Sequence, residues 1–540
     1  MSRKYEVRSM KKKNIYFLFL TSYFLLFLAS CGGGSSDGTS PSGSSASTGS
    51  GGSSSPDEII RGSGSVKISG TVQYEDRTFD RTGFTGAEYK AVRFADIEIV
   101  NASNSSVIAS TATDGSGNYS ISLSPISEGV YVRCLTSTSI RFKNSLKSYN
   151  IEVVNGNSSV YSIVSDAFSI SSSGAYSKNL TASVSSGAGG PFNILDILID
   201  GAEFVVSKNG GFTSGKVKAF WYDGSTDGTY YNSATNTLHF LGKATDSDSY
   251  DDMVILHEFG HWIANNFSKD NSPGGDHTVT GHYDIRLAWS EGWATFFACS
   301  VRSYAGYSNP QYYVDTTGES GNGNLLFSYE IETPSYSSYA KGSDNELAVA
   351  SVLWDIFDDA NDDNLSMGFS GIWDVAKNYL PSAAEVSLED FWDGWFYRGY
   401  GSPGNPISIF LARAIDYTSD GYESDNNSSQ AKTVNIGTSY YHTYYPSGDE
   451  DWIKFTATAG SAYTIETLNL TNGADTHLFL YSTDGATLIT SNDDRSFTDA
   501  SSLITWTAAS GGTYFVRSKS YSDSGAISSY GSYYLKVSAQ

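Results

Sequence analysis

The sequence predicts three folded domains in one chain: a β-sandwich, a central α+β domain and a second β-sandwich. Residues 66–180 and 420–540 alternate apolar and polar side chains between turns rich in Gly, Asp and Ser, as strands do. Residues 190–415 instead contain longer apolar segments with helical spacing. The length of 540 residues fits this organisation, since one domain usually takes about 100–200 residues.

Composition narrows the classes of function. The formal net charge of −24 argues against a nucleic-acid partner and suits a soluble, extracytoplasmic surface. The 38 tyrosines and 54 glycines, beside only 4 methionines, fit abundant β-structure and many turns. With three cysteines, the chain has no disulfide framework.

Residues 1–31 carry the features of an export signal. Three lysines at 11–13 precede an apolar run at 15–28, which is shorter than the about 20 residues of a transmembrane anchor. The following Leu-Ala-Ser-Cys resembles a bacterial lipobox, which implies cleavage before Cys31 and lipid on its thiol. Because Gly32 stands where an aspartate would signal inner-membrane retention, we expect a lipid-anchored protein of the bacterial cell envelope, at the outer membrane or cell surface.

Residues 32–65 are nearly all Ser, Gly and Thr, with too little apolar surface to fold. They predict a flexible tether with a reach of roughly 30 Å. The sandwich expected at 66–180 follows. Its turn at 113–119, which leads into a strand, resembles the carboxypeptidase-regulatory-like, transthyretin-type sandwich. Cys134 has an inward register in this domain and is expected to be a buried small apolar residue.

The strongest motif lies in the central domain. His-Glu-Phe-Gly-His at 257–261 stands inside a proline-free apolar run that predicts a helix. Helical periodicity places His257 and His261 on one face, where two neutral imidazoles can bind one divalent ion. Zinc favours such nitrogen ligands, at about 2.0–2.1 Å. Glu258 then lies beside the metal, where the general base for a catalytic water belongs.

Glu291 is the expected third ligand. It lies in a second predicted helix, at 287–297, and its carboxylate would complete a two-His, one-Glu catalytic zinc site. His-Glu-Phe-Gly-His followed by Glu-Gly-Trp-Ala resembles the gluzincin clan of zinc metallopeptidases. The resemblance implies that His257, His261 and Glu291 hold zinc and that Glu258 is the catalytic base. His277 and His282, between the two helices, remain alternative ligands.

The chain departs from the gluzincin pattern in three ways. The interval between His261 and Glu291 is longer than usual, so an additional loop is expected there. No Gly-Ala-Met-Glu-Asn run precedes the first helix, so the aminopeptidase device for holding a free N-terminus is not recognisable. Thr295 stands four residues after Glu291, where thermolysin-like enzymes offer an aspartate behind a ligand.

Other parts of the site are less determined by the sequence. Candidates for stabilising an oxyanion are Tyr329, Tyr336, Tyr339 and His282. The predicted strand at 237–241 is expected to pair with an extended peptide, while His239 on it is expected to be an ordinary strand side chain. The acidic run at 245–252 is a candidate for calcium, but helix capping explains it adequately.

The last segment returns to strands and turns. Its acidic and aromatic motifs include Gly-Asp-Glu-Asp-Trp-Ile-Lys-Phe at 448–455 and Ala-Asp-Thr-His-Leu-Phe at 474–479. Their order resembles the bacterial pre-peptidase C-terminal domain, a β-sandwich appended to secreted proteases. The resemblance implies calcium as a second candidate metal, with Asp449, Asp451 and Asp475 as oxygen ligands. A purely structural role for these aspartates is the alternative.

Taken together, these patterns predict a zinc-dependent metalloendopeptidase that hydrolyses peptide bonds of extracellular proteins. It would be bound to the membrane through lipid on Cys31, with a protein or peptide substrate as its partner. The alternatives are an aminopeptidase-like exopeptidase and a non-catalytic surface adhesin or binding protein.

Overall fold

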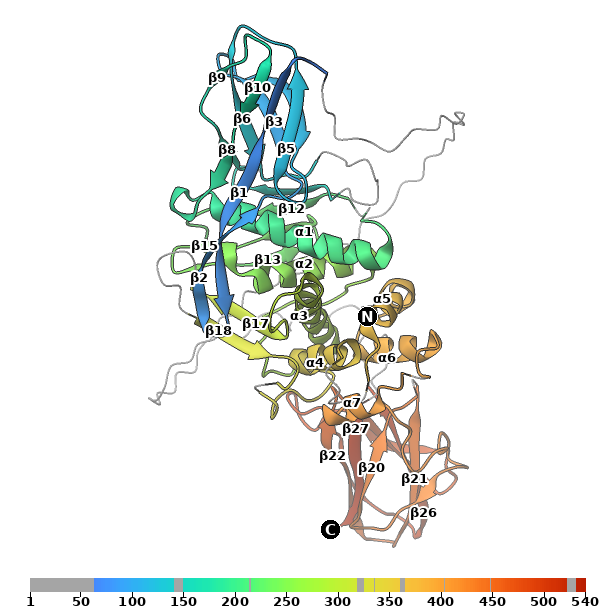
Figure 1. The fold of residues 1–540 in the computed structure, drawn as a ribbon. Coiled ribbons are helices and arrows are strands. Elements are labelled where there is room, and N and C mark those ends of the chain that lie inside the picture. The colour runs from blue at the N-terminus through green and yellow to red at the C-terminus, as the bar shows by residue number, and fades with distance from the viewer. Residues whose placement is uncertain are drawn as a thin grey trace, which may run out of the picture.

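The computed structural model describes residues 63–139, 149–212, 215–317, 325–334, 336–359, 365–402, 404–446, 448–521 and 531–540. The predicted signal peptide with Cys31 and most of the predicted tether lie outside these residues. The described part begins with β-sheets, continues as a helical α+β region and ends in a β-sandwich (Figure 1). This is the predicted fold class.

The N-terminal strands are β1 (Val66–Asp80), β2 (Gly83–Ala91), β3 (Asp96–Asn101), β4 (Val107–Ala112), β5 (Asn118–Leu123), β6 (Gly129–Leu135), β8 (Ser162–Val164), β9 (Phe168–Ser169), β10 (Gly174–Ser177) and β11 (Leu180–Ala182). One sheet has the order β10-β1-β11, with β2 and β5 also paired to β1; the other has the order β4-β3-β6-β8, with β9 paired to β6. Alternate residues of β1 fill the space between them: Val66, Ile68, Val72 and Tyr74 are at most 1% exposed. Cys134 is buried, as expected.

The central sheet is built from two distant parts of the chain. Its strands are β7 (Ile151–Val154), β12 (Val217–Phe220), β13 (Tyr230–Asn232) and β14 (Thr237–His239), in the order β13-β14-β12-β7. β7 comes from the segment predicted to belong to the first sandwich, yet it pairs in parallel with β12. β13 is antiparallel to β14 and forms the other edge. Two short antiparallel hairpins belong to the same region: β15 (Gly242–Lys243) with β16 (Asp246–Ser247), and β17 (Tyr312–Thr316) with β18 (Leu325–Glu330).

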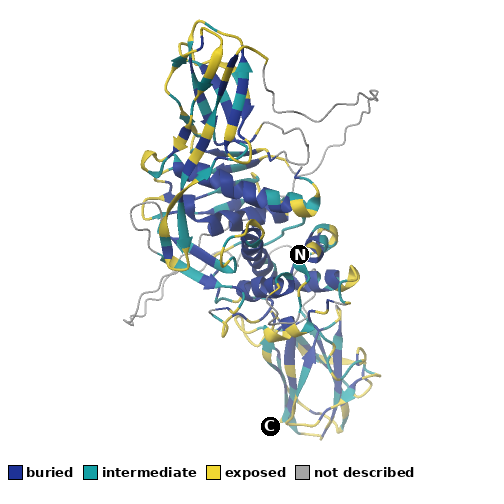
Figure 2. Cartoon of the chain, viewed as in Figure 1, coloured by how far each residue is buried: buried dark blue, intermediate teal, exposed yellow. Residues whose placement is uncertain are grey.

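The helices of the central region are α1 (Gly189–Asn209), α2 (Asp252–Phe267), α3 (Ile285–Ala305), α4 (Glu346–Phe357), α5 (Gly368–Asn378), α6 (Leu388–Tyr397) and α7 (Ile407–Ala412), with the short 3-10 helices η1 (Val184–Ser186), η2 (Asp248–Tyr250) and η3 (Leu380–Ser382). The first four α-helices are mostly buried (Figure 2). None of the helices in the described part of the chain is long and apolar enough to cross a membrane.

Two glycines allow the central helices to pack closely. A Cβ on Gly260 of α2 would lie 2.9 Å from Cα of Ala294 on α3. A Cβ on Gly292 of α3 would lie 2.6 Å from Cβ of Val349 on α4. Because such distances are too short for carbon atoms, only glycine permits these approaches. The histidines of α2 and the glutamate of α3 are thereby brought together.

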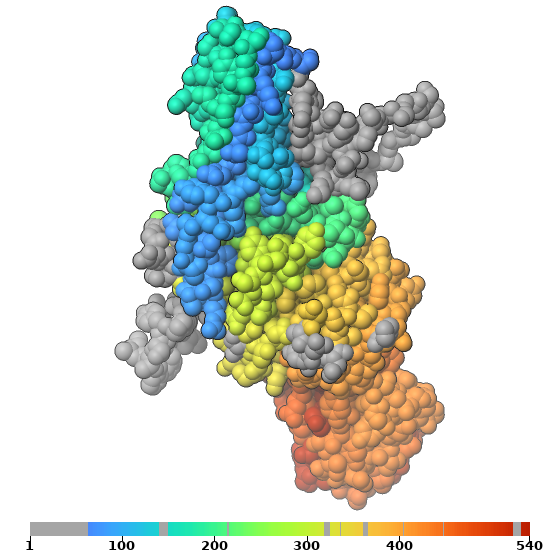
Figure 3. Space-filling view, in the orientation of Figure 1, coloured from blue at the N-terminus to red at the C-terminus, as the bar shows by residue number. Residues whose placement is uncertain are grey.

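The N-terminal sheets and the central region share one continuous apolar core. A charged contact reinforces this junction: Arg93, after β2, lies 2.5 Å from Asp196 and 2.7 Å from Asp200, both on α1. The C-terminal domain has a separate core and forms its own lobe in Figure 3. The N-terminal sheets are therefore packed into the central region, whereas the C-terminal domain is a separately packed unit.

The C-terminal strands are β19 (Lys432–Thr433), β20 (Ser439–Thr443), β21 (Glu450–Ala457), β22 (Ala462–Thr471), β23 (Thr476–Tyr481), β24 (Leu488–Asn492), β25 (Leu503–Thr507), β26 (Gly512–Ser520) and β27 (Ser532–Ala539). They form two sheets, with the orders β19-β21-β26-β23-β24 and β20-β27-β22-β25. Apolar residues of both sheets meet in the core between them.

Candidate metal centre

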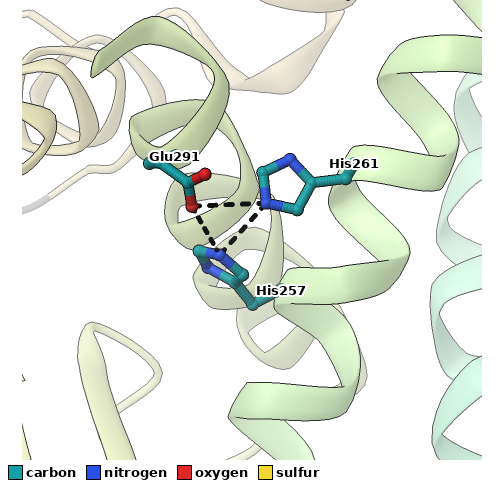
Figure 4. Close-up of side chains that lie close together, drawn as sticks. All are labelled: His257, His261 and Glu291. Carbon is teal, nitrogen blue, oxygen red and sulfur yellow. Dashed lines mark hydrogen bonds and ion pairs between the residues drawn. The ribbon is translucent and has the colours of Figure 1, made fainter. Parts of the chain in front are cut away.

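Three side chains from two helices converge at one point (Figure 4). Nε2 of His257 lies 3.2 Å from Nε2 of His261, and both atoms face Oε2 of Glu291, at 3.1 and 3.3 Å respectively. All three residues are buried. His257 and His261 lie one turn apart on α2, and Glu291 lies on α3, as the sequence predicts.

The triangle has the dimensions of a zinc site. Four ligands placed tetrahedrally at about 2.0–2.1 Å from a metal lie about 3.3–3.4 Å from one another. The three observed separations, 3.1–3.3 Å, match the edges of that tetrahedron and leave its fourth corner for a substrate or water. Burial lowers the pKa of His257, which favours the neutral, metal-binding form of the imidazole. Burial alone would raise the pKa of Glu291, but the surrounding histidines, His277 first, lower it well below its usual range.

The second nitrogen of each imidazole has a hydroxyl partner. Nδ1 of His257 lies 3.2 Å from Oγ1 of Thr295, and Nδ1 of His261 lies 3.1 Å from Oγ of Ser290. Ser290 in turn donates to Asp270 at 2.7 Å. When Nδ1–H of each ring donates to its hydroxyl, the lone pairs on Nε2 point into the triangle. Thr295 therefore contacts the histidine ligand from the position where thermolysin-like enzymes have an aspartate.

Glu258 borders a cavity of about 450 Å³ next to the triangle. Its side chain is 4% exposed, and among the described residues its Oε2 has no hydrogen-bond partner. Burial raises its pKa to about 7, against the lowering effect of His261. A carboxylate with this pKa can accept and return a proton near neutral pH, as a general base must.

The two alternative histidine ligands have different places. His282 is exposed and lies 2.9 Å from Oδ1 of Asp344. His277 is buried and lines the cavity; its Nδ1 is 2.7 Å from Oε2 of Glu346 and its Nε2 is 3.5 Å from Oε2 of Glu291. It is not among the residues whose ligand atoms all lie within 4.8 Å of one another. His277 is thus a neighbour of the triangle rather than one of its corners.

The tyrosine candidates are spread over different environments. Tyr329 lines the cavity, and its hydroxyl lies 3.2 Å from Thr295. Tyr336 is partly buried, and Tyr339 is 53% exposed. His239 lies outside the triangle, because its ring stacks between Phe220 and Tyr230, as expected of a strand residue.

Residues 206–397 match the family model of the mycolysin C-terminal domain, and this match includes both helices of the triangle. The central region is a zinc metallopeptidase domain. Residues 449–520 match the bacterial pre-peptidase C-terminal domain, which confirms the resemblance seen in the sequence. Among curated proteins, the comparison gave no match.

Two solved structures resemble the chain over a fifth of its length. The pre-peptidase C-terminal domain of a collagenase from Bacillus anthracis is 18% identical, with 20% of this chain and 93% of that chain covered and a TM-score of 0.17. A periplasmic inhibitor of g-type lysozyme from Aeromonas hydrophila is 16% identical, with 20% and 96% covered and a TM-score of 0.16.

The C-terminal domain contains a buried acidic group. Oxygen atoms of Glu423, Asp425 and Asp451 lie within 4.8 Å of one another, and Asp451 also contacts His442, at 3.0 Å. Asp425 is 0% exposed, and neither of its carboxylate oxygens has a hydrogen-bond partner among the described residues. Of the three aspartates expected as calcium ligands, Asp451 belongs to this group, whereas Asp449 and Asp475 are outside it. The acidic run at 420–431 was the signal that could have indicated Glu423 and Asp425.

Proposed function

We propose that the chain is a zinc-dependent metalloendopeptidase that cleaves extracellular proteins. The observation that carries the proposal is the buried triangle of His257, His261 and Glu291, with Glu258 in the adjoining cavity. Zinc held by the triangle would polarise the scissile carbonyl and make water nucleophilic at neutral pH. A buried site with a free coordination position and a base beside it is suited to hydrolysis rather than to a structural role.

Glu258 is the general base in this proposal. It takes a proton from the attacking water and delivers it to the nitrogen of the leaving amine. Burial supports this role, because it raises the pKa of Glu258 to about 7 and so makes it easier for the carboxylate to accept a proton from water. The backbone of Tyr231, on the edge strand β13, donates a hydrogen bond to the carboxylate of Glu258.

His277 is our candidate for the group that stabilises the oxyanion. Its Nε2 is 3.5 Å from Oε2 of Glu291, beside the position that the carbonyl oxygen would take. Glu346, 2.7 Å from the other ring nitrogen, orients the imidazole. The exposed position of Tyr339 and the contact of Tyr329 with Thr295 make these tyrosines weaker candidates.

The edge strand β13 is the proposed partner of an extended substrate. The sequence suggested the segment at 237–241, but that suggestion is wrong, because β14 is already paired with β12 on one side and with β13 on the other. β13 lies at the edge of the sheet and contributes the backbone contact to Glu258. A peptide added there would extend the sheet past the catalytic base.

A pair of substitutions tests the peptidase mechanism. Glu291→Ala should lose most of the bound zinc, whereas Glu258→Gln should keep about one zinc per chain and lose about 10²–10⁴ in rate. Zinc content and cleavage of casein are the measurements. Full zinc in Glu291→Ala with loss in His277→Ala would overturn the ligand assignment. A wild-type protein that binds zinc but cleaves no protein would favour the binding-protein alternative.

Substrates blocked at both ends distinguish the endopeptidase from the exopeptidase. We expect the wild-type protein to cleave a library of blocked peptides, with the products identified by mass spectrometry. Removal of single residues only from free N-termini would instead identify an aminopeptidase. The same library would reveal the preferred side chains.

Lipid attachment at Cys31 completes the proposal and places the enzyme at the bacterial cell envelope. It is supported by the lipobox-like sequence, together with the match of a C-terminal domain that is named for bacterial pre-peptidases. Labelled fatty acid should be incorporated into the wild-type chain but not into Cys31→Ala, which should be in the soluble fraction. Absence of label from the wild-type chain would refute the anchor.

Calcium in the C-terminal domain is the proposed second metal. Asp425 supports it, because a fully buried carboxylate without partners requires a positive charge. Burial and Asp451 together raise its pKa to about 7. Asp425→Asn should therefore bind one calcium ion fewer than the wild type, measured by equilibrium dialysis. An equal number would contradict the assignment.

A further inference from the structure

A second acidic group lies in the central region, apart from the zinc triangle. One carboxylate oxygen from each of Asp246, Asp248 and Asp315 lies within 4.8 Å of the other two. The three residues come from β16, the start of η2 and β17 respectively. All three line the cavity that Glu258 also borders. The three aspartates lie close to the active site, but none of them has a role in the proposed peptidase mechanism.

A carboxylate beside this group is only partly hydrogen-bonded. Asp251 is 1% exposed, and its Oδ1 accepts a hydrogen bond from Thr316 at 2.7 Å. Its Oδ2, like the enclosed Oδ1 of Asp315, has no hydrogen-bond partner among the described residues. Helix capping does not explain Asp251, because it occupies the N-cap of α2 without a side-chain cap bond. Helix capping, which the sequence suggested for the run at 245–252, therefore does not account for Asp251.

The charges of the group are poorly compensated. Burial raises the pKa of Asp248 to about 8, and burial together with Asp315 raises the pKa of Asp251 well above its usual range. Lys243 compensates only in part: it lowers the pKa of Asp246, yet burial still leaves that pKa raised. Thr229 donates a hydrogen bond to Asp248, which adds no charge. Three carboxylates so close together, with Asp251 as a neighbour, would be stabilised in their ionised form by a multivalent cation.

We propose that Asp246, Asp248 and Asp315 bind a calcium ion, with Asp251 adjacent to it. The donors are all oxygen atoms, which calcium prefers, whereas zinc prefers nitrogen and sulfur. Water in the cavity can supply further ligands to reach the six to eight oxygens that calcium takes. This site goes beyond the proposed peptidase function and does not depend on it.

The ion would connect three segments around the active site. Asp246 and Asp248 lie just before α2, which carries both histidines of the triangle. Asp315 lies on the hairpin β17–β18, which carries Tyr329. Calcium bound between them would hold the start of the zinc-binding helix against this hairpin. We therefore expect calcium to stabilise the central region even when no substrate is present.

Equilibrium dialysis of the full-length, zinc-loaded protein with labelled calcium tests the proposal. The double variant Asp248→Asn/Asp315→Asn should bind one ion fewer than the wild type and keep its zinc. Asp425→Asn is the matched control in the C-terminal domain: it should keep the calcium of the central region. For the wild type, calcium at about 100 times its Kd should raise Tm by roughly 5–10 °C; the double variant should lose the part of this shift that is due to the central site.

An unchanged number of calcium ions bound to the double variant would overturn the proposal. If that variant also cleaved peptides with Lys or Arg next to the scissile bond less well, the group would instead be a subsite for basic side chains. If the double variant does not fold, the milder Asp246→Asn decides, with at least tenfold weaker calcium binding expected.

Discussion

Replacing Thr295 by valine should weaken zinc binding while leaving the fold intact. Oγ1 of Thr295 is 3.2 Å from Nδ1 of His257 and 3.2 Å from the hydroxyl of Tyr329, and the side chain is 4% exposed. Valine keeps the shape but leaves Nδ1–H of the ligand buried without an acceptor. An unsatisfied buried donor costs about 1–3 kcal/mol, which corresponds to about 5–150-fold in an equilibrium constant. Loss of a group that orients a metal ligand typically costs about 10–100-fold in affinity.

We therefore expect Thr295→Val to bind zinc about 10–100-fold more weakly than the wild type. The assay is competition with a chromophoric chelator of known zinc affinity, with Tm measured in parallel to exclude unfolding. Thr295→Ser retains the hydroxyl and is the matched control, which should bind zinc almost as tightly as the wild type. Wild-type affinity in the valine variant would refute the reasoning. So would an equal loss in the serine variant, because the methyl group would then be what matters.

Three further predictions concern packing, charge and pH. Gly260→Ala should lower the free energy of unfolding by up to about 2 kcal/mol, because overpacking against α3 costs about 1–3 kcal/mol and helix propensity returns about 1; a higher Tm would contradict this. Arg93→Met should lower the free energy of unfolding, measured in urea, by near the lower end of about 3–5 kcal/mol. The Arg93 side chain is only 19% exposed, and its loss leaves Asp196 and Asp200 on α1 without their positively charged partner. The exposed Lys216→Met is its control and should change little. Finally, kcat/KM should fall as the pH drops through the pKa of Glu258, and the midpoint should lie below about 7 because a bound cation lowers that pKa; a midpoint above 7 would refute the assignment.

Local sequence signals predicted the helices well. The helix predicted around His257 and His261 is α2, and the one predicted at 287–297 lies within α3. Caps are also local: Asn345 at the start of α4 accepts a hydrogen bond from the backbone of Ala348, and Ser387 at the start of α6 forms a capping box with Asp390. Periodicity and capping are properties of neighbouring residues, so a single sequence contains them.

Strand pairing was predicted less well because it depends on distant residues. The sequence indicated a strand at 237–241 but not that partners would occupy both of its sides. Nor did it indicate that Ile151–Val154 would leave the first sandwich and pair with a strand that follows α1. Alternation of apolar residues identifies a strand and its buried face, whereas the choice of neighbour is made by the packing of the whole sheet.

The metal centre, too, was predicted only as far as local sequence reaches, because its remaining contacts involve distant residues. The spacing in α2 and the glutamate of α3 gave the three residues of the triangle, because helical geometry fixes their faces. The partners behind them, Ser290 and Asp270, depend on how the loop between the helices folds back. The place of His277 depends on that loop as well, and so the sequence left it as an alternative ligand.

The strand β7 limits how this enzyme can mature. Many peptidases are made as inactive precursors and release an N-terminal segment when they are activated. Here a cut between β11 and α1 would separate β7 from the chain that continues into the active site, although β7 is an edge strand of the central sheet. Dissociation of the severed piece would remove that strand and the Arg93 contact to α1 together. The first sandwich is therefore unsuited to being a discarded propeptide, and we expect the active enzyme to retain it.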